Sequence, residues 1–407
     1  MATAPQPQPG DTLGIYVSIP FCRAKCSFCN FASGVSSPAA IDAYITQLCA
    51  EIDLAHTTAS NLNAHLPNIV DTLYFGGGTP SLLSPAQLNR IFEALHRNFT
   101  LTPAAEITLE AAPGQISDDV LHAAQSLGVN CISLGVQSFI DREAAAVGRS
   151  HTGRSCIEEI LRLQAAGVPE LGADLIAGLP YQTPASWKHS LEVATSIGLT
   201  HLSVYMLEVD EDSRLGREVI AGGQRFHAHA TPADDLSAEL YETTCHWLPQ
   251  NGFHQYEISN FAAGSAETST HQSRHNLKYW QRTPYLGFGL DAHSMLLRGR
   301  NTAIRFANSD ELPAYNPTTT LSTITPVGPT EAFEETIFLG LRRNTGLNIA
   351  ALRAQAPVGL FASVREAAEE LIRDGLLTEQ NGHWQLTLRG RMISNDVFAT
   401  LLDTVAA

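Results

Sequence analysis

Three cysteines lie close together near the start of the chain, at Cys22, Cys26 and Cys29. Their C-x3-C-x2-C spacing puts three thiolates in one short loop after an apolar, strand-like stretch at residues 13–19. Three thiolates can hold three irons of a [4Fe–4S] cluster and leave the fourth iron open. That iron can chelate the amino and carboxylate groups of S-adenosylmethionine (SAM), and an electron from the cluster can then cleave the sulfonium to give an adenosyl radical. The spacing therefore predicts a cluster-binding loop with SAM as a second cofactor.

Other uses of clustered cysteines fit this chain less well. A structural zinc site needs four ligands, usually as two Cys pairs, and the sequence has no second pair. A disulfide framework is typical of short secreted chains, whereas this chain is long. Chance clustering is the remaining alternative. The other cysteines are isolated, at Cys49, Cys131, Cys156 and Cys245.

The composition is that of an ordinary globular protein, with 407 residues of which 44% are hydrophobic and 16% charged, enough for more than one domain. The 25 basic and 41 acidic residues give a net charge of −16, which disfavours binding to nucleic acid or to anionic lipid. The polar, Pro-rich residues 1–10 predict a disordered tail rather than a secretion signal. No apolar run approaches the roughly 18–20 residues of a transmembrane helix. Together with the clustered cysteines, this predicts a cytoplasmic protein with no transmembrane segment.

Short apolar runs alternate with longer amphipathic stretches from about residue 11 to residue 210. Six successive β–α units predict an α/β fold whose parallel strands have right-handed crossovers. Six units suit a curved, open barrel better than a closed eight-stranded one, and the chemistry of such barrels sits at the C-terminal ends of the strands. The expected strands cover residues 14–19, 69–75, 106–110, 131–136, 171–176 and 202–207, and the expected helices cover residues 39–54, 85–97, 117–126, 156–165 and 185–196.

The rest of the chain is expected to be less regular. Residues 214–305 carry scattered aromatic, His and Gly residues, and residues 313–329 are Pro/Thr-rich, which predicts a linker. Helical patterns at 330–343 and 364–373 precede a hairpin with its turn at Asn381-Gly382, which predicts a small α+β, winged-helix-like C-terminal domain. The expected boundaries are a tail at 1–10, a barrel domain at 11–215, a connecting region at 216–312, a linker at 313–329 and a C-terminal domain at 330–407.

Motifs that are weak singly fall at the ends of the expected strands. The loop at residues 76–81, GGGTPS, lacks Cβ atoms at its start, so it can approach a ligand closely, although such a loop is often only a tight turn. Glu110 ends the third strand and can accept from a ribose hydroxyl or an ammonium group, or can face solvent. Gln137 can donate and accept at once, Arg149 can bind a carboxylate, and Asp174 closes the fifth strand.

In this order behind the three cysteines, the motifs resemble the radical-SAM superfamily, and more closely the oxygen-independent coproporphyrinogen III oxidase family and its paralogues. The runs YVSIPFC, GGGTPS, GVQSF and DLIAGLP carry the resemblance, which extends over nearly the whole chain. It implies an incomplete (β/α)6 barrel. The family usually has Asn where this chain has Ala112, a departure next to the pocket that leaves Glu110 in place. The residues implied to contact SAM are Tyr16, Phe28, Gly77, Gly78, Thr79, Glu110, Gln137, Arg149 and Asp174.

Two features separate the branches of this family. The oxidase has a fourth cysteine two residues after the third, where this chain has Phe31. The run RHNLKYW at residues 274–280 resembles the HNxxYW heme-binding signature of the HemW-type heme chaperones, whose histidine is the candidate axial ligand. Imidazole ligates heme iron, and flanking aromatic rings can stack on a porphyrin. The resemblance thus implies that His275 binds heme, against the alternative of a hydrogen-bonded histidine in an irregular loop, with His293 as the second choice of ligand.

The resemblance therefore implies a heme chaperone that holds a SAM-liganded [4Fe–4S] cluster, binds heme and transfers it to an acceptor protein. The expected acceptor is a heme enzyme of the respiratory membrane. No catalytic residue is assigned. The alternative is an anaerobic coproporphyrinogen III oxidase, in which the adenosyl radical abstracts hydrogen from a propionate before carbon dioxide leaves, and Phe31 counts against it. A third alternative is a radical enzyme on another tetrapyrrole, such as anaerobic heme breakdown.

Overall fold

Parallel strands in sequence order form the centre of the protein. The structure, a computed structural model, describes residues 10–266, 269–299, 301–316 and 321–406, so the predicted tail lies almost wholly outside the described residues. The first six strands pair in parallel in sequence order, β1 with β2 through to β5 with β6, and each crossover contains helix. The six strands are β1 (Thr12–Ile19), β2 (Ile69–Gly77), β3 (Thr100–Ala111), β4 (Cys131–Gln137), β5 (Glu170–Ala177) and β6 (His201–Met206).

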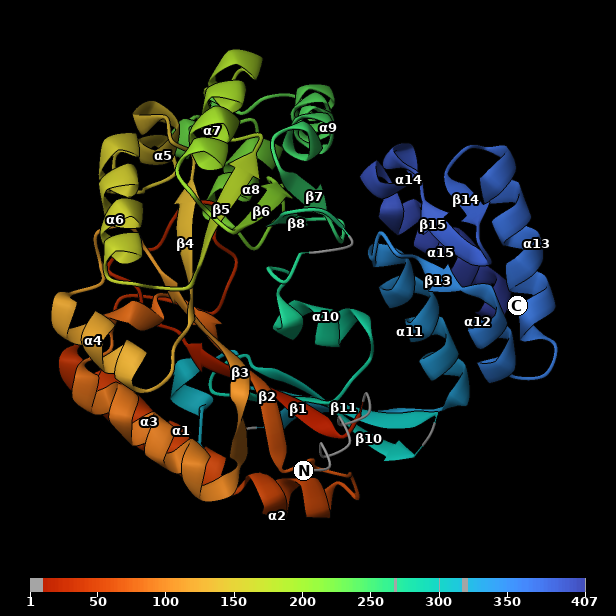
Figure 1. Ribbon diagram of the computed structural model, residues 1–407, viewed down its shortest axis with the longest axis horizontal. Coiled ribbons are helices and arrows are strands. Elements are labelled where there is room, and N and C mark those ends of the chain that lie inside the picture. The colour runs from red at the N-terminus through yellow and green to blue at the C-terminus, as the bar shows by residue number, and fades with distance from the viewer. Residues whose placement is uncertain (1–9, 267–268, 300, 317–320, 407) are drawn as a thin grey trace, which may run out of the picture.

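The sheet continues beyond both outer strands instead of closing on itself. On one side β9 (Tyr285–Phe288) pairs in parallel with β1, and β10 (His293–Gly299), β11 (Thr302–Asn308) and β12 (Leu321–Val327) follow as antiparallel strands. On the other side β8 (Asn260–Ala263) and β7 (Phe253–Gln255) follow β6. The result is an open, curved sheet, which confirms the predicted incomplete barrel (Figure 1).

The crossover helices begin where the sequence places their caps. Ser or Thr residues before four of the long helices accept a hydrogen bond from the first turn, and three of these helices start with proline, whose missing N–H costs nothing there. The crossover helices are α1 (Pro38–Asp53), α2 (Ala55–Asn61), α3 (Pro85–Asn98), α4 (Asp118–Ser126), α5 (Asp141–Ala146), α6 (Gly153–Ala165) and α7 (Pro184–Ser196), with a 3-10 turn at Pro80–Leu82.

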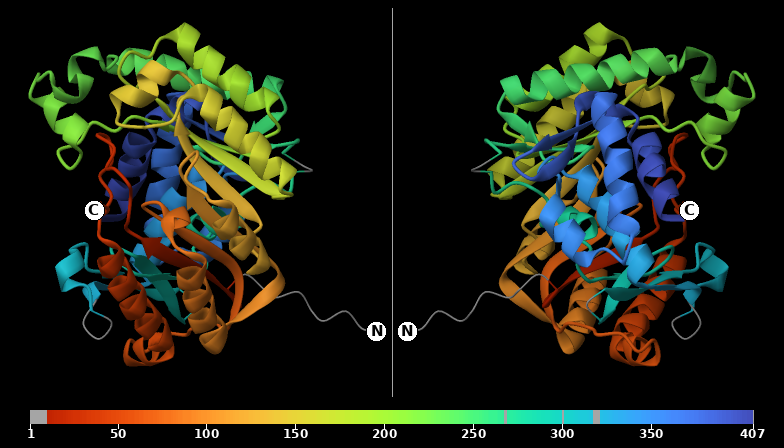
Figure 2. Two further views of the ribbon diagram at one scale, coloured as in Figure 1. Left: turned by 90° about the vertical axis from the view of Figure 1, so that its left-hand side faces the viewer. Right: turned by 90° about the vertical axis from the view of Figure 1, so that its right-hand side faces the viewer.

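Alternation along each parallel strand separates an apolar face from a polar one. In β1, for example, Leu13, Ile15, Val17 and Ile19 are fully buried and belong to the main core. Because successive side chains point to opposite faces, Tyr16 and Ser18 face the other way. Helices α1, α3, α4, α6 and α7 cover the convex, apolar face, and α10 (Arg274–Trp280) lies on the concave face (Figures 1 and 2).

The region expected to be irregular is more regular than its composition indicates. Besides strands β7 to β11, residues 214–305 contain α8 (Arg214–Ile220), a 3-10 segment at Arg225–Ala230, α9 (Asp234–Gln250) and α10. The linker prediction for residues 313–329 is wrong at β12, which pairs with β11. The irregular region and the linker were mispredicted for the same reason. The strands β7, β8, β9 and β12 are short or mostly exposed, and they form because they pair with other strands rather than because of a local sequence pattern.

The C-terminal domain is a small α+β unit with its own core. Its strands form an antiparallel sheet in the order β13-β15-β14, and the predicted hairpin turn is confirmed, with positive φ at both Asn381 and Gly382, as a two-residue type I′ turn requires. Trp384 is fully buried in this core. The elements are α11 (Pro329–Arg342), β13 (Leu347–Asn348), α12 (Ile349–Gln355), α13 (Leu360–Arg373), β14 (Leu377–Gln380), β15 (His383–Leu386), α14 (Leu388–Met392) and α15 (Ser394–Ala406).

Helix α10 lies between the sheet and the C-terminal domain (Figure 1). The Arg342 guanidinium of α11 lies 4.4 Å from the centre of the Trp280 ring at the end of α10. Glu335 of α11 pairs with Arg282 just after α10, at 2.7 Å, and with Arg305 of β11, at 2.5 Å. The C-terminal domain therefore holds both α10 and the sheet edge. Among the described residues, no helix is both long and apolar enough to cross a membrane.

Candidate cofactor and heme site

The predicted cluster loop follows β1, and each of its three sulfurs lies near a polar side chain. Thr79 Oγ1 donates to Cys22 Sγ at 3.6 Å, Arg149 Nη1 donates to Cys26 Sγ at 3.5 Å, and Cys29 Sγ lies 3.8 Å from Ser33 Oγ. Burial raises the pKa of the Cys22 thiol, and hydrogen bonds from Thr79 and Ser33 oppose that rise. Hydrogen bonds to the sulfurs are one way in which a protein sets the reduction potential of an iron–sulfur cluster.

The donor set fits a cluster better than a single ion. Among the described residues, no three His, Cys, Asp or Glu side chains are grouped so that one metal ion could bind all of them. Thiolates that each bind a different iron of a cubane do not need to converge on one point. An all-sulfur set of three ligands is what a SAM-liganded [4Fe–4S] cluster requires.

The glycine loop after β2 packs against the chain that leads into the cluster loop. A Cβ atom on Gly78 would lie 2.7 Å from the Ile19 carbonyl oxygen and 2.8 Å from the backbone of Phe21. Gly77 has φ +96°, and its backbone N–H donates to the Glu110 carboxylate. The close approach of two backbone segments therefore requires glycine in this loop whether or not a ligand is bound.

Two carboxyl groups, those of Glu110 on β3 and Asp174 on β5, lie half-buried on the two strands that flank β4. Tyr74 Oη donates to Glu110 Oε1 at 2.8 Å, and burial, together with the charge of Asp174, raises the pKa of Glu110 to about 8. Burial also raises the pKa of Asp174, against hydrogen bonds from Ser203 and Ser133. Such carboxyl groups can accept hydrogen bonds from hydroxyl or ammonium groups of a ligand.

Gln137 and Arg149 have buried polar atoms that the described residues leave without a partner. Gln137 has φ +62° although it is not glycine, a conformation that costs about 1–3 kcal/mol and is concentrated at functional sites. Its Oε1 atom and the Nε atom of Arg149 have no hydrogen-bond partner among the described residues. Arg149 Nη2 donates to the Gly135 carbonyl. Unpaired buried polar atoms at strand ends fit a site that a polar ligand completes.

The two aromatic residues predicted to contact SAM have different surroundings. Tyr16 stacks on Tyr74 with ring centres 6.1 Å apart and lines the cavities on the concave face. Phe28 packs against the apolar cluster that contains Val147 and Ile176. Three of the remaining predicted contacts touch the cluster loop or the chain leading into it, Gly78 and Thr79 after β2 and Arg149 after α5.

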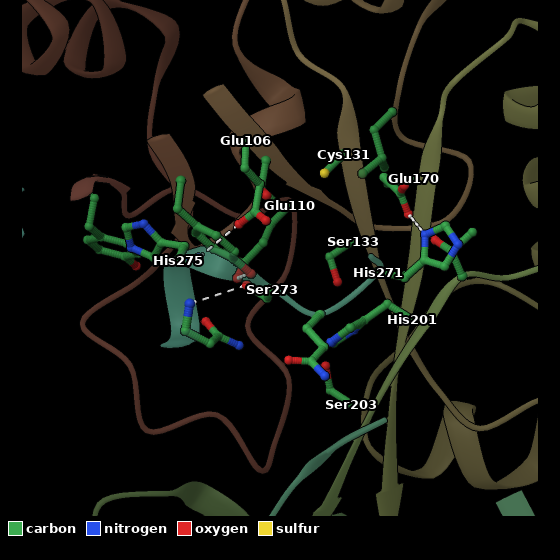
Figure 3. Close-up of a pocket in the computed structure, with 18 of the residues that line it drawn as sticks. Glu106, Glu110, Cys131, Ser133, Glu170, His201, Ser203, His271, Ser273 and His275 are labelled. Atoms are coloured by element: carbon green, nitrogen blue, oxygen red, sulfur yellow. Dashed lines mark hydrogen bonds and ion pairs between the residues drawn. The ribbon is translucent and has the colours of Figure 1, made fainter. Parts of the chain in front are cut away.

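A cavity of about 280 Å³ lies against the polar, concave face of the sheet. Period-2 positions of the strands supply its wall, since residues i, i+2 and i+4 of a strand share a face. Figure 3 shows this wall, with Glu106 and Glu110 beside His275, and with Glu170 and His201 beside His271. The strand residues that line the cavity are Tyr16, Tyr74, Glu106, Thr108, Glu110, Cys131, Ile132, Ser133, Glu170, Gly172, His201, Ser203 and Tyr205.

His275 lies in α10 and not in an irregular loop, and both of its ring nitrogens have protein partners. Nδ1 lies 2.9 Å from Thr72 Oγ1, and Nε2 lies 2.8 Å from Tyr279 Oη. The residue is 1% exposed, and its ring stacks on Tyr74. Burial, and secondarily the charge of Lys278, lowers its pKa to about 3, so the imidazole is neutral. In this conformation neither nitrogen is available to iron.

Other residues of the RHNLKYW run fix α10 to the sheet. The Glu106 carboxylate accepts from the backbone N–H groups of Arg274 and His275, at 2.8 and 2.9 Å, where the positive end of the helix dipole favours a negative charge. Buried Lys278 pairs with Asp71 at 2.7 Å. These contacts hold α10 in place in the protein without heme.

Several residues of the site were missed from the sequence. Glu106, Glu170, His201 and His271 line the cavity, and Tyr279 holds the ring of His275. A signal was present for two of them, because Glu106 and His201 open strand segments in which polar residues recur at every second position. His293, the second choice of ligand, lies near Asp291 at a different, neighbouring cavity.

Comparisons with known proteins agree with the architecture. The model described as "Radical SAM superfamily" matches residues 16–194, and the model described as "HemN C-terminal domain" matches residues 327–393. The solved structure of coproporphyrinogen III oxidase (HemN) from Escherichia coli superposes with a TM-score of 0.78 at 24% identity, covering 97% of this chain and 91% of that one. At this identity the match shows the fold.

Two curated relatives named heme chaperone HemW match almost end to end. The protein from Lactococcus lactis is 32% identical over 394 residues, which cover 96% of this chain and 97% of the relative. The protein from Bacillus subtilis is 31% identical over 399 residues, which cover 95% and 98%. The cofactors predicted from the cysteine spacing, a [4Fe–4S] cluster and SAM, are those of the matched superfamily. The resemblance found in the sequence is therefore confirmed, and the chain belongs to the HemW family within the radical SAM superfamily.

Proposed function

We propose that this protein is a heme chaperone, which binds heme in the cavity on the concave face of the sheet and transfers it to an acceptor protein. The observation that carries the proposal is the cavity itself. Histidine and tyrosine side chains line it, and it extends to the strand ends where the implied SAM contacts lie. The name of the relatives from two bacteria supports the same function.

The resident cofactor is proposed to sit on Cys22, Cys26 and Cys29. Glu110, Gln137, Arg149 and Asp174 would bind and orient SAM, together with the backbone of the glycine loop and the rings of Tyr16 and Phe28. When bound, the cluster supplies an electron that can cleave SAM. The side chains of this chain provide hydrogen bonds to the sulfurs and a buried polar pocket for the ligand.

Heme is proposed to be the cargo, with His275 as an iron ligand. For Nε2 to reach iron, its hydrogen bond to Tyr279 must open, so tight binding requires a local rearrangement of α10. The pKa of about 3 keeps the ring neutral at physiological pH, and iron binding at Nε2 uses the tautomer whose proton is on Nδ1.

The acceptor is proposed to be a heme protein of the respiratory membrane, reached from the cytoplasm through protein contact. A net charge of −16 makes direct adsorption to anionic lipid unfavourable. The C-terminal domain is a candidate docking surface, since it contacts the end of α10 through Arg342 and the residue Arg282 just after it through Glu335.

The test is heme binding and transfer with purified protein. We expect the parent protein to bind hemin and to pass it to a heme-free acceptor, and we expect His275→Ala to bind hemin more weakly. His246→Ala is the control, because His246 is an exposed residue of α9 outside the cavity. A His275→Ala variant with parental affinity would exclude His275 as a ligand.

A parallel assay addresses the oxidase alternative. Anaerobically reconstituted protein with SAM, a strong reductant and coproporphyrinogen III should give no protoporphyrinogen IX, while an authentic oxidase turns over in the same buffer. Product formation over many turnovers would replace the chaperone proposal with an enzyme.

A further inference from the structure

His271 is the histidine of the cavity whose ring is arranged like a metal ligand. It lies on the segment before α10, and its side chain is 31% exposed. Nδ1 lies 2.7 Å from Glu170 Oε2, at the first residue of β5. Nε2 has no hydrogen-bond partner among the described residues, and the residue lines the cavity.

The contact with Glu170 determines what the free nitrogen can do. A carboxylate accepts a hydrogen bond only from an N–H group, so in the neutral imidazole this contact selects the tautomer with hydrogen on Nδ1 and a lone pair on Nε2. Metal-binding histidines almost always make such a contact through the second nitrogen, because it orients the ring and raises its basicity. His271 therefore presents an oriented lone pair to a cavity.

The other candidate ligands of the cavity are less available. His275 has both nitrogens engaged. His201 contacts Tyr256 Oη through Nε2 at 2.8 Å. Cys131 is held as a thiol, since burial raises its pKa to about 12.

The surroundings fit heme iron better than a bare ion. A bare divalent ion needs several protein ligands, and the described residues contain no group of three suitable side chains. Porphyrin iron already has four nitrogen ligands and needs only an axial one. Phe31 lines the same cavity, and this aromatic side chain is 62% exposed, so it offers a flat apolar surface to a porphyrin.

A surface ion pair is the simpler explanation of a His–Glu contact, and the chain contains an example. His246 and Glu242 lie 3.8 Å apart on the exposed side of α9, and neither lines the cavity. The His271–Glu170 contact is shorter, at 2.7 Å, and lies in the cavity wall. These two differences separate it from the exposed pair.

We propose that His271 Nε2 is the first axial ligand that incoming heme iron meets, before α10 releases His275. This inference rests on the proposed heme-binding function and adds a residue and an order of events to it. Figure 3 shows His271 and His275 at separate places on the wall, so each can act without the other. Glu170 is a positioning residue, which acts on iron only through the imidazole.

The test uses hemin and rapid-mixing absorbance with the full chain. His271→Ala should slow the first phase of hemin association by more than about tenfold, whereas His246→Ala should associate like the parent. His275→Ala should keep the fast first phase and, when reduced, still show an iron–histidine stretch in resonance Raman spectra. His271 lies outside the main core, so its replacement should leave the fold intact.

Glu170→Gln supplies a readout that a purely structural contact would not change. The amide still accepts from Nδ1, but without the negative charge the imidazole donates less to iron, so the reduction potential of bound heme should rise. An unchanged first phase and unchanged spectra in His271→Ala would overturn the inference. If the parent protein itself binds no hemin, the proposed function fails first.

Discussion

Replacing Tyr279 by phenylalanine should tighten heme binding, because it removes the group that occupies Nε2 of His275. The two atoms lie 2.8 Å apart in a site where His275 is 1% exposed. Binding of iron by this nitrogen must break that contact. In the variant the nitrogen is already unpaired, so the heme-free protein is raised in free energy while the heme complex is changed little.

The magnitude follows from the cost of an unpaired buried acceptor. In the tautomer that iron binding needs, with the proton on Nδ1, Nε2 accepts from Tyr279 Oη. Leaving such a group without its partner costs about 1–3 kcal/mol, and every 1.4 kcal/mol is tenfold in affinity, so the gain should be about 5- to 150-fold. Nδ1 keeps its contact with Thr72 at 2.9 Å, which should preserve the ring orientation. The same substitution should lower the free energy of unfolding of the heme-free protein by a similar amount.

The assay is a hemin titration followed by absorbance, with urea unfolding of the heme-free variants alongside. Tyr241→Phe is the matched control, because the Tyr241 hydroxyl also donates a partly buried hydrogen bond, to the Ile258 carbonyl, but lines neither cavity. It should lose stability without gaining affinity for hemin. In a His275→Ala background, Tyr279→Phe should have no effect on affinity, since the two residues act as one unit.

Two results would refute this reasoning. Unchanged or weaker hemin affinity in Tyr279→Phe, with His275→Ala still impaired, would mean that the Tyr279 contact does not oppose binding. A gain that persists in the His275→Ala background would mean that the hydroxyl acts on heme by some other route.

The remaining predictions concern the cofactor end of the sheet. Gly78→Ala should lower both Tm and iron content after anaerobic reconstitution, because the new Cβ would lie 2.8 Å from the Phe21 backbone. Gly34→Ala is the control and should match the parent, because its Cβ would have no atom within 4 Å. Equal iron content in the two variants would contradict this prediction. Cys29→Ser should abolish the visible absorbance of the reconstituted cluster, and retention of three-quarters or more of it would exclude Cys29 as a ligand. Folding raises the pKa of Glu110 from 4.5 to about 8, so the folded state keeps a proton that the unfolded state releases. The contribution of this proton to the free energy of unfolding is complete below about pH 4.5 and is lost as pH rises through 8. Glu110→Gln should therefore lose less stability than the parent between about pH 6 and pH 9 in urea unfolding, and an identical loss would show that the carboxyl is not buried as described.

The parallel strands were predictable because local pattern and tertiary environment agree there. A strand such as residues 14–19 is buried on the helix side by Ile15, Val17 and Ile19, and its crossover helix starts at a Ser-Pro pair. These signals act over a few residues and need no knowledge of the rest of the chain. The cluster loop is equally local, since three ligands lie within one short segment.

The heme end of the site was less predictable because it is assembled from distant segments. Glu170 meets His271 about a hundred residues later in the chain, and Glu106 accepts from the start of α10. Strand β12 follows the same rule, because its exposed, Thr-rich sequence gains order only from pairing with β11. A local sequence pattern identifies the type of residue at each position, but it does not show which distant residues the crossovers bring into contact.

The state of His275 illustrates what a motif leaves open. The resemblance named the residue and its chemistry, and nothing in RHNLKYW indicates that both ring nitrogens are engaged by Thr72 and Tyr279. A histidine that is buried, neutral and fully hydrogen-bonded is stable without its ligand, as a carrier that must also exist empty requires. A ligand bound through such a residue is held only by the difference between the iron bond and the contacts that it replaces. In the proposed chaperone, release of heme to an acceptor would then need less free energy than release from a histidine with a free nitrogen. The two hydrogen bonds that engage His275 in the heme-free protein would therefore favour delivery of heme.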